Sequence, residues 1–280
     1  MAIRSRGTNT PLFLIHDVGG SVLRYEHLAR HFPDDQAIYA IESRGLSGLP
    51  VDYNVPAMAS HYIRQIRERQ PHGPYFVVGH SFGGLVTYEI GRQLSAQKEP
   101  MGLVGLLDTF QRNLVEEDAL LQEAPQKLGK LPILKRLTKD ARSLVLGRDR
   151  IGYLQERQTY LRAWMHKTLY RSAYKLSSRF GWRMPPFLKD VKEANWIASD
   201  YFTPEPYDGT VVLFRCQNRI DTDPPDSSRI WQRLAGKVVI LEVPGDHNSM
   251  LGEPGVRVLA EQISSFLKPA NATPVETSVP

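Results

Sequence analysis

The decisive stretch of this chain is Tyr75-Phe76-Val77-Val78-Gly79-His80-Ser81-Phe82-Gly83-Gly84. Its first four residues are β-branched or aromatic, which predicts a buried strand. The next five form the pattern G-x-S-x-G, and the apolar periodicity that follows predicts a helix. A serine between such a strand and helix lies in a sharp turn that lifts its hydroxyl above the sheet edge, so we predict Ser81 as a nucleophile.

The glycines of this motif have a steric reason. Side chains at Gly79 and Gly83 would clash with the neighbouring strand and helix backbones. The helix N-terminus behind Ser81 adds positive potential where an oxyanion would form. The alternative is a plain glycine-rich turn, so the strand-turn-helix context carries the prediction and the bare pattern does not.

The same alternation of short apolar runs and amphipathic stretches continues on both sides of this motif. It predicts a mostly parallel sheet flanked by helices, the α/β class. The expected strands are Leu12 to Ile15, Ala37 to Ile41, Tyr75 to Gly79, Gly102 to Leu107, Thr210 to Arg215 and Lys237 to Glu242. The expected helices are Pro56 to Arg69, Phe82 to Gln97, Ser227 to Leu234 and Val256 to Leu267.

The alternation stops at Phe110 and resumes after residue 200. The stretch between is rich in Leu, Lys and Arg, is interrupted by prolines, and shows no convincing strand. We therefore predict one α/β core, residues 1–110 and 201–268, into which a helical lid is inserted at 111–200. The proline-containing end, 269–280, lacks apolar periodicity and is predicted to be a disordered tail.

The net charge of +5 is concentrated in one segment. Between Lys127 and Lys189 there are sixteen Lys or Arg against three acidic residues, so the rest of the chain is net negative. A segmental charge of this kind favours a basic face that meets an acidic partner, and it argues against a general nucleic-acid-binding protein.

Two further features concern the compartment. The single cysteine, Cys216, excludes a disulfide framework and fits a reducing cytosol. The first apolar run, Leu12 to Ile15, is far shorter than a signal-peptide core or a membrane span. We expect a cytoplasmic protein that acts on a small molecule and binds neither membrane nor nucleic acid.

A serine hydroxyl needs a base and an orienting acid, which in this fold follow in the order Ser, acid, His. His247 is the expected base because it lies in a turn-forming loop directly after a strand, at the edge where open α/β folds bind ligands. His16 and His80 lie near the site and are expected to be wall or turn residues. The other histidines fall on predicted helices or linkers: His27, His31, His61, His72 and His166.

The acid has two candidate positions. Asp108 ends the strand Gly102 to Leu107 and is preferred, since a carboxylate at a strand end can reach a histidine on a neighbouring loop. The alternatives follow the strand Thr210 to Arg215, the commoner place for the acid in this fold: Asp221, Asp223 and Asp226. Asp246, beside His247, is expected to be a turn residue.

The oxyanion hole requires two backbone donors. The expected donors are the amide of Phe82, after the nucleophile, and that of Val18, in the loop after the first strand. The sequence has no spacing typical of a zinc, calcium or P-loop site, so we expect no metal and no cofactor.

Several of these segments together resemble the thioesterase domains that end nonribosomal peptide and polyketide synthases, members of the α/β-hydrolase superfamily. They are Leu14-Ile15-His16-Asp17-Val18-Gly19-Gly20-Ser21, Gln70-Pro71-His72-Gly73-Pro74-Tyr75, Gly79-His80-Ser81-Phe82-Gly83-Gly84, Tyr201-Phe202-Thr203-Pro204-Glu205-Pro206-Tyr207-Asp208-Gly209 and Val243-Pro244-Gly245-Asp246-His247. The resemblance covers both halves of the core and leaves out residues from about 111 to 198. Many family members have Trp where this chain has His80.

The resemblance implies a function and a site. It places the acid after the strand that follows the nucleophile's helix, which corresponds to Asp108, and it implies a helical lid after that strand. It also implies release of an acyl, peptidyl or polyketide chain from the phosphopantetheine of an acyl or peptidyl carrier protein domain, by hydrolysis or cyclisation. The alternatives are a stand-alone editing thioesterase, a general carboxylesterase and a non-catalytic carrier-docking module.

Overall fold

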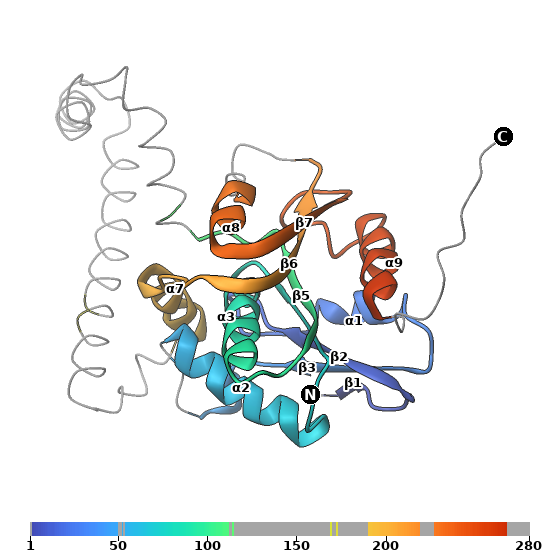
Figure 1. Ribbon diagram of the computed structural model, residues 1–280, viewed down its shortest axis with the longest axis horizontal. Helices are drawn as coiled ribbons and strands as arrows, with labels where there is room; N and C mark the ends of the chain where they lie inside the picture. Colours follow the sequence, from blue (N-terminus) through green and yellow to red (C-terminus); the bar gives the residue numbers. More distant parts are fainter. Residues whose placement is uncertain are drawn as a thin grey trace, which may run out of the picture. The chain divides into compact units, whose positions relative to one another are not determined.

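The computed structural model describes residues 2–49, 52, 54–111, 114, 169, 172, 190–218 and 227–267 (Figure 1). Most of them belong to the unit made of Met1–Val115 and Lys189–Pro280. The second unit, Glu116–Leu188, lies outside the described residues apart from Leu169 and Ser172. The lid predicted at 111–200 and the tail predicted at 269–280 therefore stay predictions.

A seven-stranded sheet runs through the described part of the chain (Figure 1). Its order is β1-β3-β2-β4-β5-β6-β7, and only β1 is antiparallel to its neighbour. Parallel neighbours need crossover connections, which is why helices alternate with strands along the chain. The strands are β1 Ala2–Arg4, β2 Asn9–Ile15, β3 Gln36–Ile41, β4 Tyr75–His80, β5 Met101–Leu107, β6 Tyr207–Cys216 and β7 Ala235–Val243.

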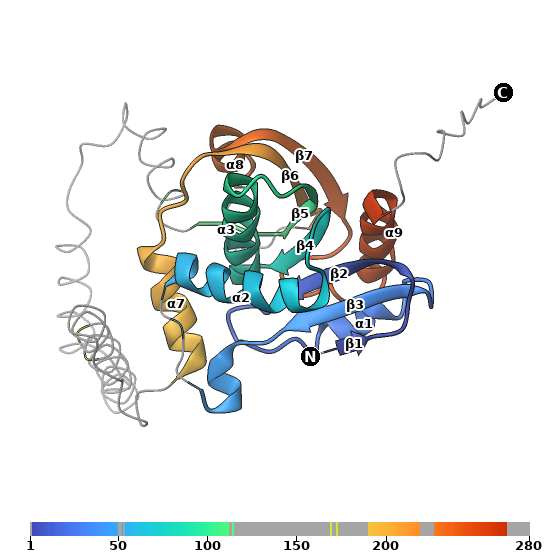
Figure 2. The same ribbon diagram turned by 60° about the horizontal axis from the view of Figure 1, so that its bottom comes forward.

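Helices cover both faces of this sheet (Figures 1 and 2). Successive side chains of a strand point to opposite faces, and β2 shows the result: Phe13 and Ile15 belong to one buried cluster, Leu12 and Leu14 to another. The first cluster includes α2 (Val55–Arg69), α3 (Phe82–Ala96), α7 (Val191–Tyr201) and α8 (Ser228–Leu234). The second includes α1 (Tyr25–Ala29) and α9 (Gly255–Leu267). The core therefore has two layers separated by the sheet.

The helix boundaries have local causes. The Asn54 side chain accepts a hydrogen bond from the Ala57 amide, which caps α2, and Pro56 stands in its first turn. Asp190 caps α7 by accepting from the amides of Lys192 and Glu193. No helix in the described ranges combines the length and the apolar character needed to span a membrane.

The predicted α/β class and mostly parallel sheet are confirmed. All six expected strands and all four expected helices are present, with boundaries shifted by a few residues. The prediction omitted β1, α1 and a 3-10 turn at Arg44–Ser47, because elements of three to five residues carry too little periodicity. Residues 191–200, predicted to end the lid, form most of α7, which contacts α3.

The register of the parallel strands decides where their loops meet. Ile15 at the end of β2 pairs with Gly79, and His80 at the end of β4 pairs with Leu107 at the end of β5. The loops that follow these strands therefore leave the sheet side by side at its carboxyl edge.

Candidate active site

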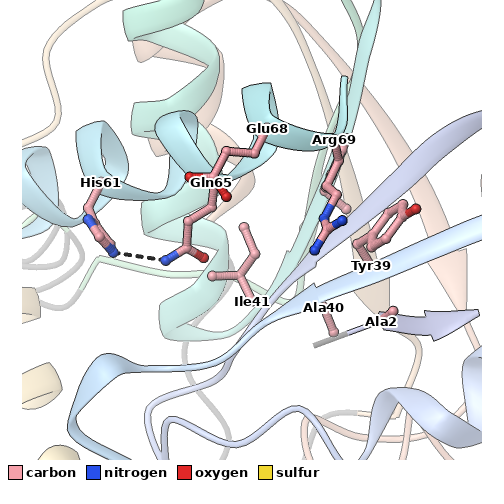
Figure 3. A pocket seen from close by; sticks show the side chains of 9 residues that line it. Ala2, Tyr39, Ala40, Ile41, His61, Gln65, Glu68 and Arg69 are labelled. Carbon is pink, nitrogen blue, oxygen red and sulfur yellow. Dashed lines mark hydrogen bonds between the residues drawn. The ribbon is translucent and has the colours of Figure 1, made fainter. Parts of the chain in front are cut away.

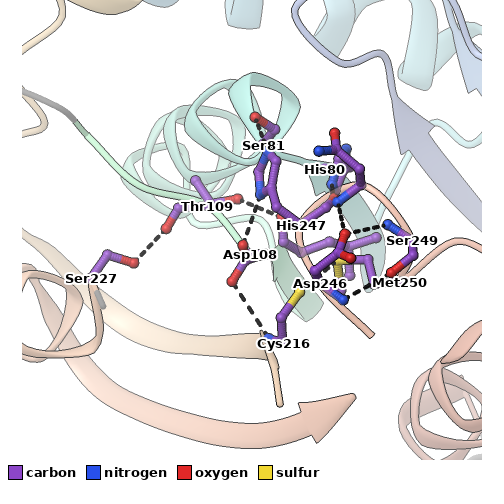
Figure 4. Close-up of polar contacts among 12 residues, drawn as sticks. His80, Ser81, Asp108, Thr109, Cys216, Ser227, Asp246, His247, Ser249 and Met250 are labelled. Atoms are coloured by element: carbon purple, nitrogen blue, oxygen red, sulfur yellow. Dashed lines mark hydrogen bonds and ion pairs between the residues drawn. The ribbon is translucent and has the colours of Figure 1, made fainter. Parts of the chain in front are cut away.

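Three side chains from three loops meet at the carboxyl edge of the sheet (Figure 4). Ser81 follows β4, Asp108 follows β5 and His247 follows β7. The Nε2 atom of His247 lies 3.1 Å from the Ser81 Oγ, and its Nδ1 lies 2.7 Å from an oxygen of the Asp108 carboxylate. Because an ionised carboxylate only accepts, Nδ1 carries the hydrogen and Nε2 offers its lone pair to the hydroxyl. An imidazole held in this way can take the proton of Ser81.

Ser81 lies in a strained turn. It has φ 54° and ψ −118°, immediately precedes α3 without a capping bond from its side chain, and donates its amide to the carbonyl of Leu107 at 2.9 Å. A Cβ on Gly79 would lie 2.2 Å from the carbonyl oxygen of Gly83, and a Cβ on Gly83 would lie 2.4 Å from that of His16. The predicted backbone clashes at both glycines are therefore confirmed.

Asp108 is held by backbone contacts on both sides. Its φ is 40°, its amide donates to the carbonyl of Phe214 at 2.8 Å, and the residue is only 4% exposed. The amide of Cys216 lies 3.5 Å from its second carboxylate oxygen. The alternatives Asp221, Asp223 and Asp226 lie outside the described residues. Among the described residues, Asp108 is the carboxylate that lies against Nδ1 of His247.

A tight turn orients His247. The carboxylate of Asp246 accepts hydrogen bonds from the amides of Asn248 and Ser249, at 2.8 and 2.9 Å, and these bonds lower the pKa of Asp246. Asp246 is therefore the turn residue that we expected. Gly245, with φ 102°, supplies the left-handed conformation before it.

His80 contacts both the backbone and the ring of His247. Its ring centroid lies 4.8 Å from that of His247, and its Nε2 donates to the carbonyl of His247 at 2.9 Å. Burial lowers the pKa of His80 to about 3, so the ring is neutral and its Nδ1 keeps a lone pair, which has no partner among the described residues. His80 was expected to be a wall or turn residue. The structure shows that it is hydrogen-bonded to the backbone carbonyl of His247.

The two predicted oxyanion donors lie on either side of the nucleophile's turn. Phe82 begins α3, where the first amides have no acceptor within the helix. Val18 lies in the loop after β2, and β2 is the neighbour of β4. Within the described ranges neither amide donates to a backbone carbonyl in the turns and loops. Their role in binding an oxyanion stays a prediction.

Two residues that bind backbone groups near the site are not indicated by any motif in the sequence. Asn195 on α7 donates its side-chain amide to the carbonyl of Val18 at 2.9 Å. Arg24, just before α1, donates to the carbonyl of Asn248 and lies 3.9 Å from the carboxylate of Asp17. Asn195 is 177 residues from Val18 and Arg24 is 224 residues from Asn248, and neither belongs to a motif, so only the fold reveals these two contacts.

A separate cavity of about 330 Å³ lies between α2 and β3 (Figure 3). Ser81, Asp108 and His247 do not line it. Three of its polar side chains have partners: the Gln65 amide lies 2.8 Å from His61, and the Arg69 guanidinium stacks 5.7 Å from the Tyr39 ring centroid. Within the part of the chain that the structure describes, no cluster of three or more His, Cys, Asp or Glu side chains could hold a metal ion.

Several known proteins are similar to parts of this sequence. The model of the family described as "Thioesterase domain" matches residues 10–267. The nonribosomal peptide synthetase btyA of Aspergillus terreus is 39% identical over 110 residues, which are 39% of this chain and 12% of the relative. Malpinin synthetase of Mortierella alpina is 37% identical over 131 residues, 46% of this chain and 2% of the relative. The chain thus spans a small part of these curated relatives.

A similar fold occurs among solved structures. The NocB thioesterase domain, solved as a covalent complex with a fluorophosphonate nocardicin G analog, has a TM-score of 0.59 and 22% sequence identity. The match covers 94% of this chain and 96% of that one. At this identity the similarity concerns the fold.

Proposed function

The chain belongs to the thioesterase domain family, and on that premise we propose that it releases an acyl, peptidyl or polyketide chain from the phosphopantetheine arm of a carrier domain. The reaction passes through an ester of Ser81. One observation carries this proposal: the imidazole of His247 is hydrogen-bonded to the Ser81 hydroxyl through one nitrogen and to the Asp108 carboxylate through the other.

In the first step, Nε2 of His247 takes the proton of Ser81 while Oγ attacks the thioester carbonyl. The carbonyl oxygen becomes an oxyanion, which the amides of Phe82 and Val18 bind. The intermediate collapses to the Ser81 ester and expels the pantetheine thiolate, which receives the proton from His247. Asp108 stays ionised and stabilises the transient imidazolium.

In the second step, water or a hydroxyl or amine of the bound chain gives its proton to His247 and attacks the ester. The bond to Ser81 Oγ breaks, and Oγ recovers a proton from His247. Water yields a free acid, and an internal nucleophile yields a ring. Both outcomes use the same three side chains, so access of water to the acyl-enzyme decides between them.

A carrier domain is the proposed partner. The matches cover only 12% of btyA and 2% of malpinin synthetase, so both relatives have room for further domains, and we infer that a thioesterase segment within such a protein receives its substrate from one of them. The predicted basic segment between Lys127 and Lys189 would suit an acidic carrier surface.

Intact-mass analysis tests the proposal. We expect a fluorophosphonate probe and a panel of acyl-pantetheine thioesters each to add mass to one site, Ser81. Ser81→Ala should lose the adduct, and Ser21→Ala, a partly buried serine in the loop after β2, should keep it. Absence of any adduct in the wild type would point to a non-catalytic docking module. Much faster turnover of free esters than of thioesters would point to a carboxylesterase.

A further inference from the structure

The peptide bond between Asp17 and Val18 is fixed through its carbonyl. The carbonyl oxygen of Asp17 accepts two hydrogen bonds, from His16 Nδ1 at 2.7 Å and from the amide of Gly20 at 3.0 Å. This peptide is trans, so its N–H, which belongs to Val18, points opposite to that carbonyl. Whatever holds the Asp17 oxygen therefore also sets the direction of the Val18 amide.

The protonation of His16 follows from its two partners. A carbonyl only accepts, so Nδ1 carries the hydrogen, and Nε2 must accept from the Tyr62 hydroxyl at 2.7 Å. Burial lowers the pKa of His16 to about 4 and raises that of Tyr62. Both groups are therefore neutral at physiological pH, and Tyr62 holds the imidazole in the tautomer that donates to Asp17.

The surroundings leave this pair little freedom. The side chains of His16 and Tyr62 are fully buried. The His16 ring centroid lies 5.9 Å from that of Phe82, the residue that supplies the other predicted oxyanion amide. The backbone of His16 also lies so close to Gly83 that no side chain fits between them. His16 thus connects the loop after β2 to the start of α3.

We propose that His16 and Tyr62 are positioning residues, which aim the Val18 amide at the oxyanion formed on the Ser81 substrate. This inference rests on the proposed function. Without the Nδ1 donor, the Asp17 carbonyl keeps only the Gly20 amide, and the peptide can rotate. The oxyanion then loses one of its two donors, and such a loss costs about 100-fold in kcat. KM should change little, because the donor acts in the transition state.

Matched variants at one position test this role. In His16→Asn the side-chain amide nitrogen takes a place close to that of Nδ1 and can still donate to Asp17. In the double variant His16→Leu/Tyr62→Phe the donor is gone, and no buried hydroxyl is left unpaired. We expect kcat with an acyl-pantetheine thioester to fall about 100-fold in the double variant, with little change in KM, and most of the rate to remain in His16→Asn. Tyr62→Phe alone should cause a smaller loss. It removes the hydroxyl that donates to Nε2 of His16, so the imidazole is no longer restricted to the tautomer with hydrogen on Nδ1, but the ring itself is still present.

Two controls separate the possible failures. Thermal unfolding and labelling of Ser81 by the fluorophosphonate establish that each variant is folded and has its nucleophile. If the wild type is neither labelled nor active, the proposed function fails. If the wild type is active but the folded double variant keeps its kcat, or His16→Asn loses as much as the double variant, the inference is wrong.

A measurement on the wild type tests the tautomer even where a variant does not fold. The ¹⁵N spectrum of the His16 imidazole should show a neutral ring protonated at Nδ1 throughout the neutral pH range. A ring protonated at Nε2 would overturn the inference.

Discussion

Replacing Asp108 by Asn tests the candidate site with the least disturbance of the fold. The side chains have the same shape, and asparagine tolerates the φ of 40° at this position. The backbone bond to Phe214 is unaffected. An amide oxygen can still face the Cys216 amide, so the amide nitrogen then faces His247. We expect the variant to fold with nearly unchanged stability.

The expected loss of rate is large. In the wild type the carboxylate accepts from Nδ1 of His247 at 2.7 Å, which leaves Nε2 free to act as base. An asparagine amide donates instead, so Nδ1 must accept and the hydrogen moves to Nε2, which can no longer take the Ser81 proton. In a serine protease this change of tautomer lowers kcat about 10⁴-fold, or about 5.5 kcal/mol, and we expect a similar loss here.

Single-turnover acylation with an acyl-pantetheine thioester is the assay, since it isolates attack by Ser81. Asp246→Asn is the matched control. This neighbouring carboxylate binds the amides of Asn248 and Ser249 and the Ser249 side chain, an asparagine oxygen can still accept from those amides, and the variant should keep most of the rate. Asp223→Asn tests the alternative acid and should also keep it. A folded Asp108→Asn variant with a loss below about tenfold would refute the assignment of Asp108, and a large loss in Asp223→Asn would move the acid to the later loop.

Three other outcomes are expected. Gly83→Ala should lower the free energy of unfolding, measured in urea, by about 3 kcal/mol or more, because the added Cβ would meet backbone oxygens. Gly252→Ala is the control and should cost much less, because its added Cβ would lie 3.3 Å from the nearest atom, the Ser249 carbonyl oxygen. His80→Phe removes the donor to the His247 carbonyl and should lower kcat about tenfold. His80→Gln keeps a donor and should recover part of this rate. Equal losses of kcat in the two variants would argue against a role for that hydrogen bond. The folded pKa values of His16 and His80, about 4 and about 3, lie below the ordinary 6.5. The unfolded chain therefore binds more protons as the pH falls below about 6.5, and the free energy of unfolding should fall by up to about 1.4 kcal/mol per pH unit for each histidine. Urea unfolding at about pH 7 and about pH 5 measures this slope, which should be smaller in His80→Phe; an unchanged slope would contradict it.

Much of the fold could be predicted because its signals are local. Buried runs such as Tyr75-Phe76-Val77-Val78 identify central strands, since both faces of a parallel strand are covered. The glycines beside Ser81 indicate a backbone that approaches its neighbours closely, and the distances at Gly79 and Gly83 confirm this. The strand β1 was not predicted, because three residues are too few to show an apolar periodicity and they form a strand only by pairing with β3.

The two histidines next to the motifs show the limit of such reasoning. His16 and His80 were interpreted as wall or turn residues, because the sequence shows that they are near the site but not what their ring nitrogens bind. The Nε2 atom of His16 binds Tyr62 on α2, and that of His80 binds the carbonyl of His247, which are 46 and 167 residues away along the chain. A hydrogen bond depends on the direction of both groups, and no local pattern encodes that direction.

The sequence by itself determined the class of the sheet and the sharp turn at Ser81, because apolar periodicity and glycine sterics act between near neighbours. Tertiary structure alone decided that Asp108 faces His247, that Tyr62 binds His16 and that Asn195 binds the carbonyl of Val18. These contacts arise where the strand order β2-β4-β5-β6-β7 brings separate loops, and the helices α2 and α7, to one edge of the sheet. Strand order is a property of the packed sheet as a whole, since it depends on which faces can be buried together.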